Sequence, residues 1–211
     1  MTDVLSQIEK LKVVPVIALE SAGDAAPLAD ALVAGNLPIA EVTFRTAAAP
    51  ESIRTMAKRG GLLVGAGTVS NVDTVKKAMD CGATFIVSPG FNPKVVAYCV
   101  QNKIPVTPGI SSATDIESAL DHGLNTVKFF PAEAIGGLKL LKALAAPYGQ
   151  MRFMPTGGIT QQNISEYLKF PKVIACGGSW MVTKELLSAK NFAQITQLSN
   201  EAVKLANAAR P

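Results

Sequence analysis

The stretch Thr126-Val127-Lys128-Phe129-Phe130-Pro131 combines a strand-like apolar run with a single lysine and ends on a proline. Alternate side chains of a strand share a face, which predicts that Lys128 points the same way as Thr126 and Phe130. A buried ammonium is costly unless it is paired or loses its proton, and the neutral amine can attack a carbonyl. Lys128 is therefore a candidate nucleophile. The alternative is a strand edge that leaves the ammonium in water.

Similar apolar runs recur on both sides of this stretch, and a helical pattern follows each of them. The eight predicted strands cover residues 13–19, 39–44, 62–68, 84–89, 104–108, 126–131, 152–156 and 173–177. The helices after them cover residues 24–34, 49–58, 72–80, 93–101, 113–121, 137–145, 162–168 and 192–207, and an amphipathic helix over 3–12 precedes the first strand. This order predicts an α/β fold, namely a (β/α)8 TIM barrel with a short N-terminal helix. An open doubly wound sheet is the alternative, but no G-x-G-x-x-G turn follows the first strand.

The composition of the chain predicts a single barrel domain over residues 1–211. Hydrophobic residues make up 48% of the chain and charged residues 17%, which is enough apolar material for one sizeable core. The net charge of +4 comes without a cluster of lysines and arginines, so no nucleic-acid partner is expected. No apolar run is long enough to span a bilayer, so no membrane association is expected.

The cysteines and the single histidine bear on location and cofactors. Cys81, Cys99 and Cys176 are odd in number and lack metal-ligand spacing, which predicts free thiols in a reducing compartment. The first residues also lack the pattern of a signal peptide, so a cytoplasmic protein is expected. His122 is expected to cap the end of a helix. Without a second histidine or metal-spaced carboxylates, neither a metal nor another cofactor is expected.

The second predicted strand also carries polar side chains at strand spacing. Its alternation sets Glu41, Thr43 and Arg45 on one face. Inward side chains from alternate strands of a TIM barrel form shared layers, so the second and sixth strands can contribute to one layer. Glu41 is thus predicted to face Lys128 and to provide an acid/base beside the candidate nucleophile. For Glu41 or Arg45 taken alone, an ordinary ion pair at a strand end is the alternative.

Glycine pairs follow the last two predicted strands. Gly157-Gly158 comes after the seventh, and Gly177-Gly178, followed by Ser179, comes after the eighth. In TIM barrels these two loops commonly bind phosphate through backbone N–H groups, although tight turns are the alternative explanation. Thr68 ends the third strand and is a candidate donor to a substrate carboxylate; the glycines before it lack the lysine of a P-loop.

Taken in this order and spacing, these residues resemble the bacterial 2-dehydro-3-deoxy-6-phosphogluconate (KDPG) / 4-hydroxy-2-oxoglutarate (KHG) aldolase family. The resemblance extends over nearly the whole chain and is carried by residues 41–45, 65–69, 88–90, 108–111, 127–134, 155–159 and 177–180. One departure is Asn36-Leu37, where the family usually has a glycine followed by an aliphatic residue. Because asparagine tolerates a left-handed turn, Glu41 is still expected to be placed as in the family.

The resemblance implies a class I, metal-free aldolase in which Lys128 forms a Schiff base with the C2 carbonyl of a 2-oxo acid. Glu41 then matches the general acid/base, and Arg45 and Thr68 match positions that hold the carboxylate. Further matched positions bind the phosphate or line the substrate: Gly157, Gly158, Gly178 and Ser179 in the phosphate loops, Thr156 beside the substrate, and Pro89 and Phe130 as apolar walls. The implied substrate is phosphorylated KDPG, cleaved to pyruvate and glyceraldehyde 3-phosphate in the Entner–Doudoroff pathway. A homotrimer is implied as well.

Other functions remain open at this level. KHG, cleaved to pyruvate and glyoxylate, and the galactonate epimer of KDPG are alternative substrates. A phosphate-binding barrel isomerase explains the glycine pairs but gives no use for Lys128. A non-catalytic barrel that binds sugar phosphates explains the fold but leaves Glu41, Arg45 and Lys128 without a purpose.

Overall fold

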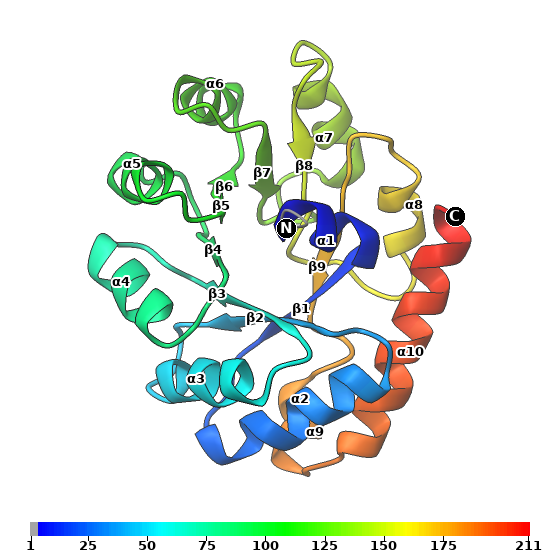
Figure 1. The fold of residues 1–211 in the computed structure, drawn as a ribbon. Coiled ribbons are helices and arrows are strands. Elements are labelled where there is room, and N and C mark those ends of the chain that lie inside the picture. The colour runs from blue at the N-terminus through cyan, green and yellow to red at the C-terminus, as the bar shows by residue number, and fades with distance from the viewer. Residues whose placement is uncertain (1–3) are drawn as a thin grey trace.

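The computed structural model describes residues 4–211, which form a ring of parallel strands surrounded by helices (Figure 1). The strands in this range are β1 (Val13–Ile17), β2 (Ile39–Thr43), β3 (Leu63–Gly67), β4 (Phe85–Val87), β5 (Val106–Thr107), β6 (Gly109–Ile110), β7 (Thr126–Phe129), β8 (Arg152–Phe153) and β9 (Cys176–Gly178). The helices are α1 (Val4–Leu11), α2 (Ala25–Ala34), α3 (Ala49–Arg59), α4 (Val72–Asp80), α5 (Pro93–Gln101), α6 (Ala113–Asp121), α7 (Gly137–Ala145), α8 (Ile164–Leu168), α9 (Lys184–Ser188) and α10 (Phe192–Ala209). The predicted TIM barrel is confirmed.

The strands pair in two sets that together complete the ring. One set has the order β5-β4-β3-β2-β1-β9 and the other the order β6-β7-β8. Bridges between Phe153 and Val173 and between Thr156 and Gly177 join the second set to the first. At the other junction Pro108 separates β5 from β6, because proline has no N–H to donate, and β6 lies beyond the end of the predicted fifth strand at residue 108. The Pro108 carbonyl still accepts from the Lys128 N–H at 2.8 Å, so the wall continues past the break.

Every predicted strand differs from the observed one by one or more residues, and in the last two strands the cause is visible. Only Arg152–Phe153 forms β8, because Pro155 interrupts the ladder, although the Thr156 N–H still donates to the Phe129 carbonyl at 2.9 Å. The last strand is β9 rather than residues 173–177, so Gly177 and Gly178 lie within a strand and not in a loop after it. A Cβ atom on Gly178 would lie 1.9 Å from the Trp180 ring, which explains this glycine by close packing rather than by a turn.

Local signals set the helix limits well. The four helices α4 to α7 have the predicted limits. Asn71 caps α4 by accepting from the Thr74 N–H at 2.8 Å, and Ser112 caps α6 in a capping box with Asp115. His122 is the C-cap residue of α6, as expected, with Nδ1 2.8 Å from the Ser118 carbonyl oxygen.

The N-terminal ends of the strands are closed by α1, which lies across that end of the ring (Figure 1). Its predicted first residue, Asp3, lies outside the described residues. Arg210 closes the same end by donating to the carbonyls of Val173 and Ile174. The opposite end of the barrel is thus the end that stays accessible.

In the described part of the chain no helix is long and apolar enough to cross a membrane.

Asn36 has a φ of 59°, as the sequence predicts for the turn before β2. This residue lies within the connection between α2 and β2, in the left-handed region that asparagine tolerates. Val42, between Glu41 and Thr43 on β2, is fully buried, which agrees with the predicted alternation of this strand.

Candidate active site

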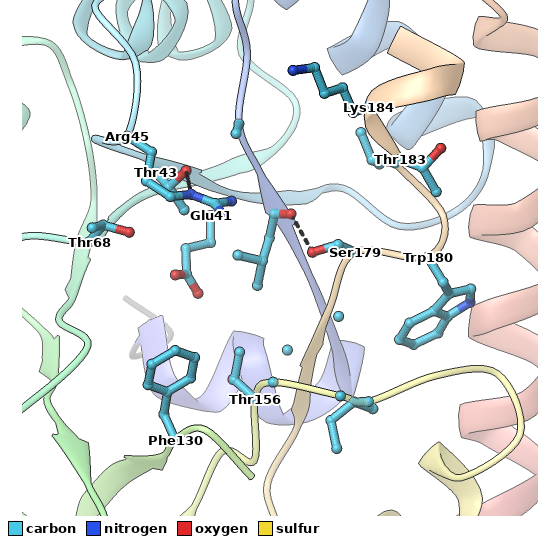
Figure 2. Close-up of a pocket in the computed structure, with 18 of the residues that line it drawn as sticks. Glu41, Thr43, Arg45, Thr68, Phe130, Thr156, Ser179, Trp180, Thr183 and Lys184 are labelled. Atoms are coloured by element: carbon cyan, nitrogen blue, oxygen red, sulfur yellow. Dashed lines mark hydrogen bonds between the residues drawn. The ribbon is translucent and has the colours of Figure 1, made fainter. Parts of the chain in front are cut away.

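A cavity of about 940 Å³ opens at the C-terminal ends of the strands (Figure 2). Every residue that the sequence predicted for the site lines it: Glu41, Arg45, Thr68, Pro89, Lys128, Phe130, Thr156, Gly157, Gly158, Gly178 and Ser179. They come from the ends of six different strands or the segments that follow them, which is where TIM barrels carry their active sites.

Lys128 and Glu41 form a buried pair on the cavity floor. Lys128 Nζ lies 3.2 Å from Glu41 Oε1, and the side chains are 6% and 0% exposed. The predicted approach of these two residues, from β7 and β2, is confirmed. Glu41 Oε2 is buried and has no hydrogen-bond partner among the described residues. Since a buried carboxylate oxygen without a partner is costly, this atom is a free acceptor for a ligand in the cavity.

Gly67 on β3 makes room for the Glu41 carboxylate. A Cβ atom at this position would lie 2.3 Å from Glu41 Oε1, which no real side chain tolerates. Thr43 and Gly67 are paired in the β2–β3 register, so the two strands bring Gly67 close to Glu41. The sequence motif 65–68 contains this glycine, but the Glu41 side chain that it accommodates lies on another strand, so only the fold shows that the two are close.

Two hydrogen bonds anchor Arg45 at the cavity wall. Its Nε donates to Thr43 Oγ1 at 2.9 Å (Figure 2). The Thr43 hydroxyl in turn donates to the Ile17 carbonyl at 2.7 Å. A guanidinium held in this way can present its remaining N–H groups to a carboxylate. Thr43 was predicted on the correct face of the strand, but its part in holding Arg45 was missed.

Thr68 has a φ of 59°, which is unusual for a β-branched residue. Such strain costs about 1–3 kcal/mol and is found mainly where function requires it. Its hydroxyl lies at the side of the cavity opposite to Ser179 and Trp180 (Figure 2).

Several glycines and Ser179 lie on the other side of the cavity. Gly157 and Gly158 have φ values of 96° and 79°, a conformation that only glycine adopts readily, so the two residues form a tight turn at the edge of the cavity. The Ser179 hydroxyl donates to the Val16 carbonyl at 2.9 Å (Figure 2). The short helix α9, which was not predicted, brings Thr183 and Lys184 to the cavity. Lys184 points away from the cavity centre and lies 3.9 Å from Glu20, a largely exposed pair of little energetic weight (Figure 2).

The floor of the cavity combines an amine, a carboxylate and an apolar wall. The Phe130 ring centroid lies 5.1 Å from Lys128 Nζ, so the amine is enclosed by its ion-pair partner and an aromatic ring. Among residues 4–211, no group of three or more His, Cys, Asp or Glu side chains is arranged to hold a metal ion. A buried lysine beside a carboxylate at the mouth of a TIM barrel is suited to an enzyme that works on carbonyl compounds.

The chain belongs to the KDPG and KHG aldolase family, whose sequence pattern matches residues 4–198. It is 48% identical over 206 residues to the 2-dehydro-3-deoxy-phosphogluconate aldolase of Treponema pallidum, covering 97% of this chain and 98% of the relative. It is 44% identical to the KHG/KDPG aldolase of Escherichia coli, covering 90% of each chain. These relatives are aldolases, a class of carbon–carbon lyases.

Solved structures agree with this assignment. The KDPG aldolase of Zymomonas mobilis with 3-phosphoglycerate is 42% identical, with a TM-score of 0.90 and 95% of both chains covered. The KDPG aldolase of Legionella pneumophila, solved with pyruvate captured as a covalent carbinolamine intermediate, is 37% identical with a TM-score of 0.92. The comparison covers 96% of this chain and 98% of the Legionella chain.

Proposed function

We propose that this protein is a class I aldolase that cleaves KDPG to pyruvate and glyceraldehyde 3-phosphate, with Lys128 as the Schiff-base residue and Glu41 as the general acid/base. The observation that carries the proposal is the buried contact of 3.2 Å between Lys128 Nζ and Glu41 Oε1 on the cavity floor. Family membership supplies the substrate class, since relatives at 43–48% identity carry the name 2-dehydro-3-deoxy-phosphogluconate aldolase.

The first step is attack of the Lys128 amine on the C2 carbonyl of the substrate. An ammonium cannot attack, so its proton must leave first, and Glu41 Oε1 at 3.2 Å is in place to accept it. The carbinolamine that forms loses its C2 hydroxyl as water when a proton is supplied, and Glu41 can return the proton for this purpose. The product of this step is a protonated imine that links Lys128 to C2.

Cleavage of the C3–C4 bond follows. Glu41 takes the proton of the C4 hydroxyl, C4 becomes the carbonyl carbon of the departing aldehyde, and the bonding electrons move onto the imine to give an enamine. Protonation of C3 regenerates an imine, and its hydrolysis releases pyruvate and the free amine. Since Glu41 Oε2 has no partner in the described chain, it is the carboxylate oxygen best suited to meet the C4 hydroxyl. A general base of this kind contributes about 10²–10⁴-fold in rate.

The ends of the substrate fit opposite sides of the cavity. Arg45, anchored through Nε, and Thr68 suit the C1 carboxylate on one side. The glycine turn at 157–158 and the end of β9 at Gly178–Ser179 suit the phosphate on the other side, since phosphate commonly binds after the last two strands of a TIM barrel. Pro89, Phe130 and Thr156 would then flank the carbon chain between these two ends.

KHG is proposed as a second substrate, cleaved to pyruvate and glyoxylate by the same steps. It requires the carboxylate site, Lys128 and Glu41, but not the phosphate site. The E. coli relative is named for both substrates, which supports this extension. The isomerase and the non-catalytic barrel have no comparable support, because neither gives a use to a buried lysine in contact with a carboxylate.

The decisive experiment for this proposal is retro-aldol turnover of Lys128→Ala and Lys128→Arg. Both variants lose the attacking amine, and turnover of KDPG is expected to fall to background, measured as pyruvate with a coupled lactate dehydrogenase assay. Turnover near that of the wild type in a folded Lys128→Ala protein would exclude the imine mechanism.

The assembly and the cellular location of the protein are also part of the proposal. The family resemblance supports a single-domain chain that assembles as a homotrimer, and light scattering after gel filtration tests this assembly. The cytoplasm is proposed because Cys81, Cys99 and Cys176 are buried free thiols, which suit a reducing compartment.

A further inference from the structure

The turn formed by Thr156, Gly157 and Gly158 rests on the segment that follows Phe130. The Ala132 N–H donates to the Thr156 carbonyl at 2.8 Å, and the Glu133 N–H donates to the Gly157 carbonyl at 3.0 Å. A Cβ atom on Gly158 would lie 2.6 Å from the Glu133 Cβ, so the turn touches Glu133 with no space left between them. A contact that holds Glu133 in place therefore also holds the Thr156–Gly158 turn, which lines one side of the cavity.

Tyr167 fixes the Glu133 side chain. Its hydroxyl donates to Glu133 Oε1, and the tyrosine itself is only 2% exposed. Gly137 leaves space for the contact, since a Cβ there would lie 3.1 Å from Glu133 Oε1 and 3.3 Å from Tyr167 Oη. Burial and the hydrogen bond to Glu133 raise the pKa of Tyr167, so the phenol keeps its proton and acts as the donor at neutral pH.

Tyr167 lies on α8, and the start of this helix also holds the glycine turn directly. Asn163, at the start of α8 and one helical turn before Tyr167, donates through Nδ2 to the Gly158 carbonyl at 3.0 Å. Its Oδ1 accepts from the Thr160 N–H at 2.8 Å. The glycine turn is thus tied to α8 at two points, once through Asn163 and once through Glu133 and Tyr167. Neither Glu133 nor Tyr167 lines the cavity, so neither has a place in contact with the substrate.

We infer that the Tyr167–Glu133 hydrogen bond positions the Thr156–Gly158 turn and thereby sets the affinity for the phosphorylated end of the substrate. The inference rests on the proposed function. Two successive glycines with positive φ form a segment that is free to adopt many conformations unless its neighbours hold it. A turn held in its binding conformation beforehand binds an anion more tightly, because less ordering is required on binding. The Lys128 amine pairs with Glu41, whereas Tyr167 pairs with Glu133, so imine chemistry is not expected to depend on the Tyr167–Glu133 hydrogen bond.

The test is Tyr167→Phe, which keeps the ring and removes the donor. The KM for KDPG is expected to rise about tenfold, which corresponds to the loss of one hydrogen bond to a charged group, while kcat stays within about twofold. Inorganic phosphate, used as a competitive inhibitor, is expected to lose affinity by a similar factor. The pyruvate concentration that gives half-maximal borohydride trapping is expected to stay unchanged, because pyruvate carries no phosphate.

The chain offers a matched control in Tyr148→Phe. The Tyr148 hydroxyl donates to Glu117 Oε1 at 2.8 Å, which is the same kind of hydrogen bond, but neither residue lines the cavity or contacts the glycine turn. This variant is expected to leave KM and phosphate inhibition unchanged. Glu133→Gln, which keeps an acceptor for Tyr167, is expected to restore most of the affinity that Glu133→Ala loses, and this pair tests the inference if Tyr167→Phe is poorly folded.

The inference is overturned if folded Tyr167→Phe shows unchanged KM and phosphate inhibition, or if pyruvate trapping weakens as much as KDPG binding does. Failure of the proposed function looks different. In that case the wild-type protein forms no borohydride-stable adduct with pyruvate and does not cleave KDPG.

Discussion

Replacing Gly67 by alanine tests how closely the position of Glu41 controls the reaction. The new Cβ would lie 2.3 Å from Glu41 Oε1, about 1.1 Å short of the 3.4 Å at which ordinary contact begins. It would also lie 2.7 Å from the Glu41 Cγ and 2.9 Å from the Cδ, so rotation of the carboxylate alone does not relieve the clash. The whole end of the Glu41 side chain must therefore move by about 1 Å relative to Lys128.

A displacement of about 1 Å in a reacting group typically costs about 10²-fold in rate. We expect kcat/KM of Gly67→Ala for KDPG to fall by about 10²-fold, because proton transfers by Glu41 then start from the wrong position. Gly67 has no positive φ, so alanine is compatible with the backbone there. Circular dichroism and gel filtration are expected to match the wild type, and pyruvate production in the coupled assay gives the rate.

Gly149→Ala is the matched control, because a Cβ at Gly149 meets no atom within 4 Å and the residue has no positive φ. It is expected to have wild-type activity. If Gly67→Ala retained wild-type kcat/KM, the position of Glu41 would not matter to the reaction, and the role proposed for this carboxylate would be wrong.

Three further perturbations test separate parts of the account. Glu41→Gln is expected to retain borohydride trapping of pyruvate on Lys128 but to lose about 10²–10⁴-fold in KDPG turnover; unchanged turnover would remove Glu41 from the mechanism. Thr68→Gly is expected to raise the free energy of unfolding by about 1 kcal/mol, because it relieves the φ of 59°, and to raise the KM for KDPG; denaturant titration that shows a loss of stability would contradict the strain. Burial raises the pKa of the Cys99 thiol from 9.0 to about 11, so the folded protein keeps this proton in a pH range where the unfolded chain loses it. The stability that this group contributes is complete below pH 9 and is lost as the pH rises toward 11. Urea titrations at about pH 8 and pH 10 are therefore expected to show a smaller fall in the free energy of unfolding for Cys99→Ala than for the wild type. Equal falls in the two proteins would exclude this contribution.

The sequence predicts much of the fold because the signals that set it are local. Asn71 caps α4 and Gly82 follows its end with a φ of 95°, so both limits of this helix are visible within a few residues. Alternation along single strands was also sufficient to set Glu41 and Lys128 on inward faces, and the barrel rule then brought them together.

What the sequence did not predict depends on contacts between distant segments. Gly178 looks like a turn residue, but it lies in β9 opposite Pro15 of β1, and the Trp180 ring against its backbone leaves room only for glycine. The fit of Gly67 to Glu41 and the hydrogen bond from Tyr167 to Glu133 link residues on different elements. The short helix α9 has only five residues, too few for a clear periodic pattern.

The central claim is that Lys128 forms an imine with the 2-oxo acid, and one measurement tests it directly. The protein is incubated with pyruvate and borohydride, digested, and mapped by mass spectrometry. We predict a single pyruvate-derived adduct on the peptide that contains Lys128, and none in Lys128→Ala. No adduct on folded wild-type protein, or an adduct on a different lysine, would contradict the account.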